Sequence, residues 1–426
     1  MSSPLLTLLF TVFLAASVLL RLWLASRQIR HVAAHRAAVP KAFEATVTLA
    51  AHQRAADYTI AKLRLGIFTM AFGAAMLLGW TLLGGLDALN AWLLEHAHPR
   101  LGDLGYQLAL LAAFAAISSL IELPLEAWST FGLEQRHGFN HMKPGLWWAD
   151  QLKSLALATA VGLPLAALML WLMAAAGPGW WLWGFGVWVA FSLLALLVYP
   201  SVIAPLFNKF QPLEDGALKA RVESLMARCG FAAQGLFVMD GSRRSAHANA
   251  YFTGFGKAKR VVFFDTLLAK LSPTEVEAVL AHELGHFKHR HVVKRVAMLF
   301  ALSLAAFALL GWLSQQVGFY TGLGVAPALG VPNDALALLL FLLAGPVFGF
   351  FVTPLFARLS RRHEFEADAY ACAQTSAHDL GAALLKLYED NASTLTPDRL
   401  YVRFYYSHPP ASERLAAMGA LGAAAP

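Results

Sequence analysis

The sequence predicts an all-α membrane protein with seven transmembrane helices, and three observations support this fold class. First, 58% of the 426 residues are hydrophobic and only 14% are charged, which is too apolar for an ordinary soluble domain. Second, seven apolar stretches are long enough to cross a bilayer as helices. Third, the loops between these stretches alternate between many and few basic residues.

The seven apolar stretches define the predicted transmembrane helices. The first has no basic segment before its apolar run and is long enough to span, so we expect a membrane helix there and not a cleaved signal peptide. The predicted spans are Pro4–Leu24, Leu65–Leu83, Leu108–Leu123, Ser154–Leu172, Trp181–Val198, Val296–Leu313 and Ala335–Phe356.

The distribution of Lys and Arg predicts the orientation in the membrane. The loop after the first span is rich in both, the next loop has only Arg100, and the loop Ser314–Asp334 has none. Basic residues concentrate in cytoplasmic loops, so we expect the N-terminus outside and the C-terminus in the cytoplasm. The net charge of +7 is then explained by the basic residues of the cytoplasmic loops. A nucleic-acid partner is not expected, because no basic face with stacking aromatics is present.

Two polar regions interrupt the spans and divide the chain into four parts. Residues 1–200 hold the first five spans, 201–291 a polar region, 292–356 the last two spans, and 357–426 a second polar region. The polar regions are predicted to join in one mainly helical domain with a small β element. The predicted elements are a helix over Ala217–Cys229 and strands over Gly235–Val238, Ala250–Phe255 and Arg260–Phe264.

The pentapeptide from His282 to His286 reads H-E-L-G-H and lies on a predicted helix. Ser272 and Glu275 form a capping-box signal at the start of that helix, with Pro273 at its first position. His282 and His286 are one helical turn apart, so both imidazoles can reach one zinc ion, and Glu283 can take a proton from water. The alternative is a surface helix with two histidines.

A catalytic zinc site needs a third protein ligand, and Glu364 is the candidate. Asp368 lies one turn later and can accept the free N–H of a zinc-binding histidine. Glu366 points elsewhere and is predicted to be a solvated charge. His289 and His291 fall off the His282/His286 face and are predicted to belong to a basic cluster at the membrane edge. Spacing alone equally allows an acidic helix face paired with Arg361 or Arg362.

Two further segments have features of a peptidase site. The stretch containing Asn249, Ala250 and Tyr251 is predicted to be an exposed strand edge, to which an extended peptide can add, although a plain hairpin fits as well. His408, held before Pro409 and Pro410, can donate a hydrogen bond to a tetrahedral intermediate. The two cysteines, Cys229 and Cys372, match no zinc-ligand spacing and are predicted to be reduced structural thiols.

With these motifs the chain resembles the type I CAAX prenyl protease family of membrane zinc endopeptidases. The resemblance runs from about Leu125 onward, and the first hundred residues match only in hydropathy. It is carried by Ser129–Asn140, Ile203–Phe210, Asn249–Phe252, Phe264–Leu267, the H-E-L-G-H pentapeptide, Glu364–Asp368 and Ser407–Pro410.

The resemblance implies a seven-helix barrel around a large water-filled chamber, with one zinc ion per chain on the cytoplasmic side. By motif match, His282, His286 and Glu364 bind zinc, Glu283 is the general base, and His408 stabilises the transition state. Asp368 orients a ligand, and Asn249, with Ala250 and Tyr251, lies on the substrate-binding edge. Glu366 stands where many relatives have Gln, and we expect no effect on zinc from this departure.

In eukaryotic family members the activity removes the last three residues of a prenylated C-a-a-X terminus. The Ala-rich composition indicates a bacterial inner-membrane protein. Because bacteria generally lack protein prenylation, the peptide or protein substrate need not be lipidated. Two alternatives to this activity are a membrane quality-control protease and a zinc-stabilised transporter or scaffold. The sequence leaves the native substrate, the access route and the oligomeric state open.

Overall fold

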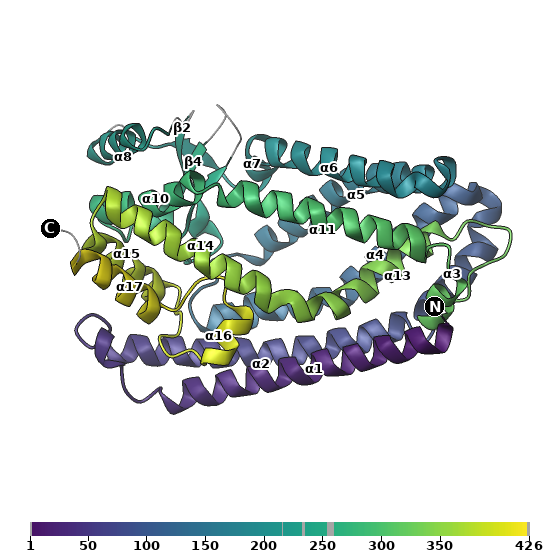
Figure 1. Cartoon of the computed structure of the whole chain (residues 1–426), viewed down its shortest axis with the longest axis horizontal. Helices are drawn as coiled ribbons and strands as arrows, with labels where there is room; N and C mark the ends of the chain where they lie inside the picture. The colour runs from purple at the N-terminus through teal and green to yellow at the C-terminus, as the bar shows by residue number, and fades with distance from the viewer. Residues whose placement is uncertain (1, 215, 232–234, 254–259, 424–426) are drawn as a thin grey trace.

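The computed structural model of the chain describes residues 2–214, 216–231, 235–253 and 260–423. Within these residues, seven helices are long and apolar enough to cross a membrane, which confirms the predicted number. The long helices run along the longest dimension of the molecule. The sheet and most of the shorter helices of the second half of the chain gather at one end (Figure 1).

The predicted spans coincide with the long helices, although the second helix ends at Trp80 and not at Leu83. Several helices continue past the apolar stretches into polar sequence. The span helices are α1 Ser3–Ala34, α2 Leu49–Trp80, α4 His98–Ala127, α5 Pro144–Ala175, α6 Trp180–Val198, α11 His291–Leu313 and α13 Asp334–Gly349. Two of them continue into π-helical turns, η2 Trp128–Glu134 after α4 and η4 Tyr199–Ile203 after α6, the latter followed by α7 Ala204–Phe207.

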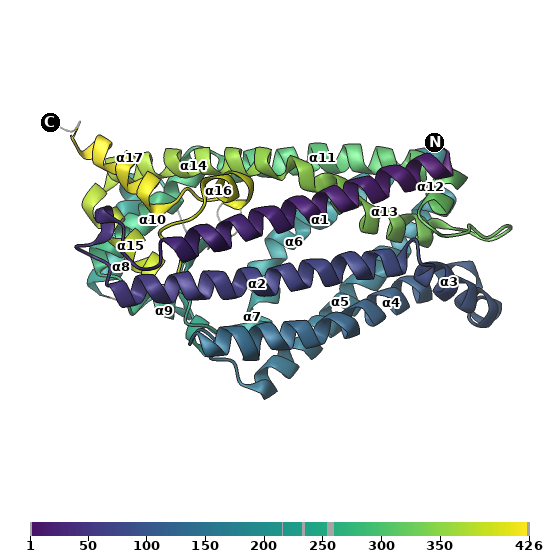
Figure 2. The same cartoon turned by 90° about the horizontal axis from the view of Figure 1, so that it is seen from below.

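The two termini lie at opposite ends of the helix bundle, as an odd number of spans requires (Figures 1 and 2). The N-terminal end also holds the short helices α3 Gly85–His96 and α12 Val317–Gly322. Buried apolar side chains from α1, α3, α4 and α13 form the largest hydrophobic cluster of this region. Along the spans many large apolar side chains are exposed, as expected for helices that face lipid.

The β element is a four-stranded sheet with the strand order β1-β2-β4-β3. Two of the three predicted strands, β2 Gly235–Met239 and β4 Arg260–Phe264, are confirmed and pair in parallel. The third, β3 Ala250–Thr253, pairs antiparallel with β4, and the predicted continuation to Phe255 lies outside the described residues. The sequence did not predict β1 Phe210–Pro212, which pairs antiparallel with β2. Within the described residues β3 is therefore an edge strand.

Helices from both polar regions pack together beside this sheet. The first region contributes α8 Ala217–Arg228, α9 Asp265–Leu268 and α10 Pro273–Lys288, and the second contributes α14 Thr353–Gln374, α15 Ala377–Asp390, α16 Arg399–Tyr405 and α17 Ala411–Ala423. Residues of α8, α10, α15 and both central strands share one hydrophobic cluster. The helix α14 continues α13 through the 3-10 turn η7 Phe350–Val352, so the seventh span leads directly into this domain. Three other 3-10 turns occupy Lys41–Phe43, Gly177–Gly179 and Gly241–Arg243.

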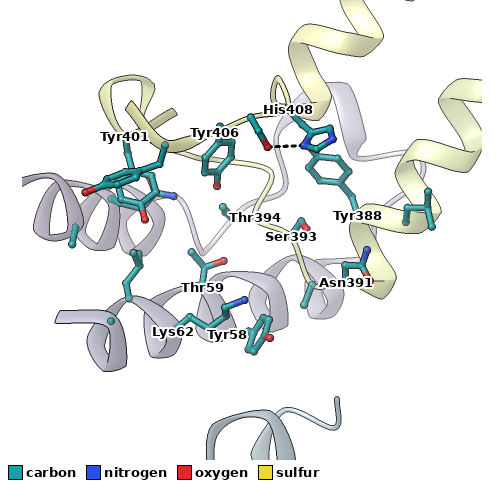
Figure 3. A pocket seen from close by; sticks show the side chains of 18 of the residues that line it. Tyr58, Thr59, Lys62, Tyr388, Asn391, Ser393, Thr394, Tyr401, Tyr406 and His408 are labelled. Atoms are coloured by element: carbon teal, nitrogen blue, oxygen red, sulfur yellow. Dashed lines mark hydrogen bonds between the residues drawn. The ribbon is translucent and has the colours of Figure 1, made fainter. Parts of the chain in front are cut away.

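A cavity of about 820 Å³ opens between α1, α2 and the C-terminal segments (Figure 3). A second cavity of about 540 Å³ shares Lys62 and Gly66 of α2 with the first and extends towards α4. Glu122 and Glu126 of α4 line this second cavity. Charged side chains within membrane spans face protein cavities or water, so their position fits a hydrated chamber inside the helix barrel.

Candidate active site

The helix α10 carries the H-E-L-G-H pentapeptide and begins with the predicted capping box. The side chain of Ser272 accepts a hydrogen bond from the backbone N–H of Glu275, and Glu275 accepts one from the backbone N–H of Ser272. Gly285 lies directly against α14, because a Cβ atom at this position would stand 2.9 Å from Cα of Ala367. The absence of a side chain therefore lets α10 and α14 approach closely enough for their functional residues to meet.

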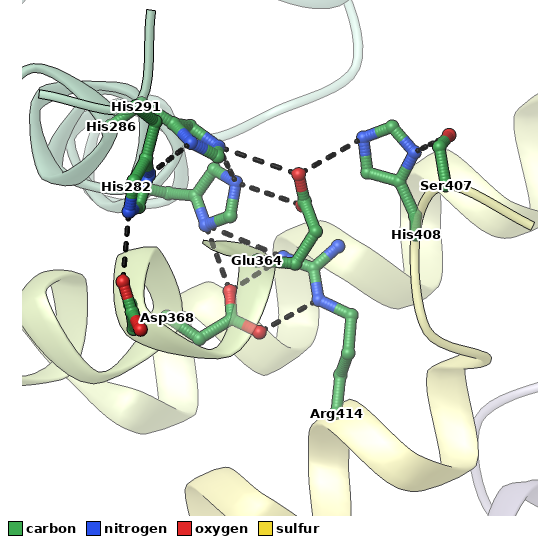
Figure 4. A network of polar contacts seen from close by, with 9 residues as sticks. His282, His286, His291, Glu364, Asp368, Ser407, His408 and Arg414 are labelled. Atoms are coloured by element: carbon green, nitrogen blue, oxygen red, sulfur yellow. Dashed lines mark hydrogen bonds and ion pairs between the residues drawn. The ribbon is translucent and has the colours of Figure 1, made fainter. Parts of the chain in front are cut away.

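His282, His286 and Glu364 converge at this crossing (Figure 4). The Nε2 atoms of the two histidines are 3.3 Å apart. Glu364 places Oε2 3.4 Å from Nε2 of His282 and Oε1 3.5 Å from Nε2 of His286. Ligand atoms on a tetrahedral metal with bonds of 2.0 to 2.1 Å are separated by about 3.3 Å, so the observed distances fit such a site.

Glu364 also has a buried oxygen that a bound cation would satisfy. The residue is 3% exposed, and Oε2 has no hydrogen-bond partner among the described residues. A buried carboxylate oxygen without a partner costs free energy unless a cation compensates it. The donor set, two imidazole nitrogens and one carboxylate, is that of a catalytic metal site with room for a further ligand.

The protonation of the two histidines agrees with such a site. Burial and the neighbouring His282 lower the pKa of His286 to about 4, which keeps it in the neutral form that binds metal. Burial also disfavours charge on His282, but the hydrogen bond with Asp368 and the adjacent carboxylate of Glu364 outweigh it and raise its pKa to about 9. The carboxylates thus favour positive charge at Nε2 of His282, which a proton or a metal ion can supply.

Asp368 and Arg414 fix the orientation of His282. Nδ1–H of His282 donates to Oδ1 of Asp368 at 2.8 Å, so Nε2 turns towards Glu364. Arg414 of α17 donates to both carboxylate oxygens of Asp368, with Nε at 2.8 Å from Oδ2 and Nη2 at 2.5 Å from Oδ1. Asp368 is 1% exposed and Arg414 is 7% exposed. The sequence did not predict a role for Arg414, because 46 positions separate it from its partner.

Glu283 takes no part in these pairs. In the part of the chain that the structure describes, its carboxylate makes no hydrogen bond and no ion pair that would occupy it. Burial raises the pKa of Glu283, and the nearby charge of Glu364 adds to the rise. A raised pKa makes a carboxylate a stronger base, which suits a group that must accept a proton from water.

His408 approaches Glu364 from the C-terminal segment, on the side opposite α10 (Figure 4). Its Nε2 is 3.5 Å from Oε1 of Glu364, and its Nδ1 is 2.9 Å from Oγ of Ser407. When Ser407 donates to Nδ1, the ring hydrogen is on Nε2 and faces the site. Burial lowers the pKa of His408, which favours this neutral form.

The predicted substrate edge borders the same space. His408 and Asn249 both line the 820 Å³ cavity, and Asn249 is exposed directly before β3. Asn249 O accepts from Phe264 N–H on the β4 side, so the backbone groups of Ala250 point to the opposite, free edge. There Ala250 N–H donates to the Asn249 side chain at 2.8 Å. Tyr251 directs its backbone to β4 and lies across from Val262.

The surroundings of the site exclude one alternative and contradict two predictions. Glu364 and Asp368 do not pair with Arg361 or Arg362, because Arg361 donates to backbone carbonyls and Arg362 binds Glu366 at 3.0 Å. Glu366, predicted to be a solvated charge, pairs with both Arg362 and His291. His291, predicted to belong to a basic cluster at the membrane edge, is 2% exposed and lies between His286 and Glu366. His289 is exposed.

The sequence matches known protease families over nearly its whole length. Residues 28–209 match the family described as "CAAX prenyl protease N-terminal, five membrane helices", and residues 212–421 match peptidase family M48. The first match begins well before Leu125, so the expectation that the first hundred residues agree only in hydropathy is wrong.

Individual relatives agree with these matches. CAAX prenyl protease 1 of Saccharomyces cerevisiae is 35% identical over 403 residues, which is 89% of this chain and 88% of that protein. The CAAX prenyl protease 1 homolog of Oryza sativa is 38% identical over 330 residues, 74% of each chain. The crystal structure of S. mikatae Ste24p superposes with a TM-score of 0.90 at 32% identity, covering 97% of this chain and 99% of that one.

This similarity over the full fold establishes the barrel architecture. The match to a peptidase family also shows that the chain is an enzyme and not a non-enzymatic transporter or scaffold. The chain belongs to peptidase family M48 and, within it, to the CAAX prenyl protease 1 proteins: it is a multi-pass membrane protease.

Proposed function

We propose that this protein is a zinc-dependent endopeptidase that binds one zinc ion through His282, His286 and Glu364. The observation that carries the proposal is the buried carboxylate of Glu364, whose Oε2 has no hydrogen-bond partner among the described residues. Its Oε2 lies 3.4 Å from Nε2 of His282 and its Oε1 3.5 Å from Nε2 of His286, which are separations that fit a tetrahedral site. Two nitrogens and one carboxylate oxygen are typical of catalytic zinc, whereas magnesium and calcium prefer oxygen ligands.

Bound zinc would act as a Lewis acid and lower the pKa of water towards neutrality. The residues of the chain supply the remaining steps. Glu283 accepts a proton from the attacking water and later passes it to the leaving amine. His408 donates from Nε2 to the oxygen that becomes negatively charged when the scissile carbonyl is attacked. Asp368 holds His282 in the tautomer that leaves its Nε2 free for the metal.

The substrate would be a peptide bound in extended form between β3 and the 820 Å³ cavity. The free backbone groups at the β3 edge can pair with a peptide strand, and Asn249 can bind its backbone. The relatives are named for CAAX prenyl substrates, and we infer that C-terminal C-a-a-X sequences, prenylated or not, are the substrate class here. The apolar and tyrosine-rich lining of the cavity can accommodate an apolar side chain or lipid.

We further propose that the zinc site and the C-terminus lie on the cytoplasmic side of a bacterial inner membrane. The alternation between loops with many and loops with few basic residues supports this orientation. The catalytic domain would then combine residues 201–291 with residues 357–426, while 1–200 and 292–356 supply the membrane spans. Close packing between α10 and α14 supports this division.

The test is zinc-dependent cleavage of a prenylated C-a-a-X peptide and of its unprenylated twin by the purified full-length protein. We expect cleavage three residues from the C-terminus, loss of cleavage with a chelator, and recovery with zinc. The comparison of the twins measures whether the lipid is recognised. The Glu283→Ala variant should bind one zinc per chain but not turn over. Retained cleavage in that variant would contradict the mechanism, and cleavage of unrelated misfolded membrane proteins alone would favour a quality-control role.

A further inference from the structure

The second histidine of the site, His286, has its own hydrogen-bond partner outside the ligand set. Nδ1 of His286 is 3.0 Å from Nδ1 of His291, and Nε2 of His291 is 2.9 Å from Oε2 of Glu366. His291 thus connects His286, which Figure 4 shows beside it, to Glu366 of α14. We propose that His291 and Glu366 are positioning residues, which hold His286 in the orientation and tautomer that bind the metal.

The turn between α10 and α11 explains how His291 reaches this place. On a continuous helix, a residue five positions after His286 would point to another face. Here α10 ends at Lys288, and Arg290 adopts a left-handed conformation with a φ of 56° before α11 begins at His291. The helix is therefore interrupted at Arg290, and His291 lies against His286, with their Nδ1 atoms 3.0 Å apart.

The hydrogen-bond directions along this series of three residues are determined by its two ends. An ionised carboxylate only accepts, so His291 must donate from Nε2 to Glu366. A neutral imidazole has a single N–H, so Nδ1 of His291 is left as an acceptor. His286 then donates from its own Nδ1, and its Nε2 lone pair faces His282 and Glu364. Glu366 thus determines the tautomer of a side chain that it does not touch.

The surroundings of His291 keep this arrangement rigid. Its ring stacks on that of His363 with centroids 4.0 Å apart and an angle of 11° between the planes. On another side it stacks on His289 at 5.5 Å. With 2% of its surface exposed, His291 has little access to water as an alternative partner. The Glu366 carboxylate, in turn, is held by Arg362 through a bond of 3.0 Å.

Both proposed metal-binding histidines are thus oriented by a hydrogen bond at Nδ1, but the partner differs. His282 contacts a carboxylate directly, through Asp368, whereas His286 reaches one only through the intervening ring of His291. Partners of this kind fix ring orientation and raise the basicity of a ligand, and their loss typically weakens metal binding about 10- to 100-fold. This inference rests on the proposed function, because it assigns a role towards the same metal.

The test measures metal affinity in the full-length protein, independently of peptide cleavage. Zinc affinity is determined by competition with a chromophoric chelator, and the visible spectrum of the cobalt-substituted protein reports the ligand geometry. His291→Phe keeps an aromatic ring on His363 but removes the acceptor, so we expect zinc affinity to fall about 10-fold or more and the cobalt spectrum to change. Glu366→Ala should have a similar effect, whereas Glu366→Gln, which still accepts from Nε2, should recover most of the affinity.

Two matched variants separate positioning from general stability. His289→Phe alters the other ring stacked on His291, and Arg362→Ala removes the second partner of Glu366, while both leave the hydrogen bonds from His286 to Glu366 intact. Each should bind zinc within about twofold of the wild type, since neither removes a hydrogen-bond partner of His291 or His286. Wild-type zinc affinity in His291→Phe, or an equal loss in His289→Phe, would overturn the inference. If the unaltered protein binds no zinc, the proposed function itself fails.

Discussion

The close approach of α10 to α14 at Gly285 predicts a sharp effect of Gly285→Ala. Gly285 of α10 lies against the backbone of Ala367 in α14, the helix that carries Glu364 and Asp368. A methyl group at position 285 would stand 2.9 Å from Cα and 3.0 Å from O of Ala367. These atoms belong to the backbone of a helix and cannot move away as a flexible side chain would.

The size of the required shift follows from these distances. Ordinary van der Waals contact begins at 3.4 Å, so the helices must separate by at least about 0.5 Å at this point. Overpacking of this kind costs about 1–3 kcal/mol, while replacing Gly by Ala inside a helix returns about 1 kcal/mol. We therefore expect a modest loss of stability. The loss of activity should be much larger, up to about 100-fold, because the metal ligands lie on opposite sides of the separated interface.

The assay compares kcat/KM for peptide cleavage with Tm and zinc content. Gly345→Ala in α13 is the matched control, since a Cβ atom there meets no atom within 4 Å. We expect the control to keep its activity and the Gly285→Ala variant to lose activity without unfolding. Wild-type kcat/KM in Gly285→Ala would refute the reasoning that this contact determines the alignment of the two helices.

Three further predictions concern single residues. Arg414→Ala removes the charged partner that donates to both oxygens of the buried Asp368 carboxylate and leaves Oδ2 without its partner, so the free energy of unfolding should fall by about 3–5 kcal/mol, as measured by denaturation, while an exposed-site variant such as Arg362→Ala should not change it comparably. His408→Ala should lower kcat about 100-fold or more and leave zinc content intact; loss of zinc would instead assign His408 to metal binding. Arg290→Val places a β-branched residue in the left-handed region and should destabilise the protein by about 1–2 kcal/mol, whereas Arg290→Gly should be tolerated, as thermal melts would report.

Local patterns in the sequence were sufficient to predict much of this fold. Apolar stretches of bilayer length identify the spans without knowledge of their neighbours, because each helix satisfies its own backbone hydrogen bonds. The start of α10 was predictable for the same reason, since Ser272, Pro273 and Glu275 act within one turn. The spacing of Glu364 and Asp368 placed them on one helix face, and the structure brings that face to α10.

The parts that escaped prediction depend on long-range contacts or on a single backbone angle. Nothing local to Arg414 indicates that α17 will bring it to Asp368. His291 was assigned to the wrong environment because the spacing argument assumed a continuous helix, and the left-handed conformation of Arg290 breaks that assumption. A residue other than glycine seldom adopts this conformation, so the sequence provides no signal for the turn.

The direct continuation of α13 through η7 into α14 has a consequence for biosynthesis. During translation, His282 and His286 are synthesised before the last two spans. Glu364 follows the seventh span in the same continuous helical segment. A nascent chain therefore lacks Glu364, the proposed third ligand, until both of these spans have been made. Arg414, which holds Asp368, comes later still. The proposed metal site is thus complete only in a chain whose seven spans and C-terminal helix have all been made.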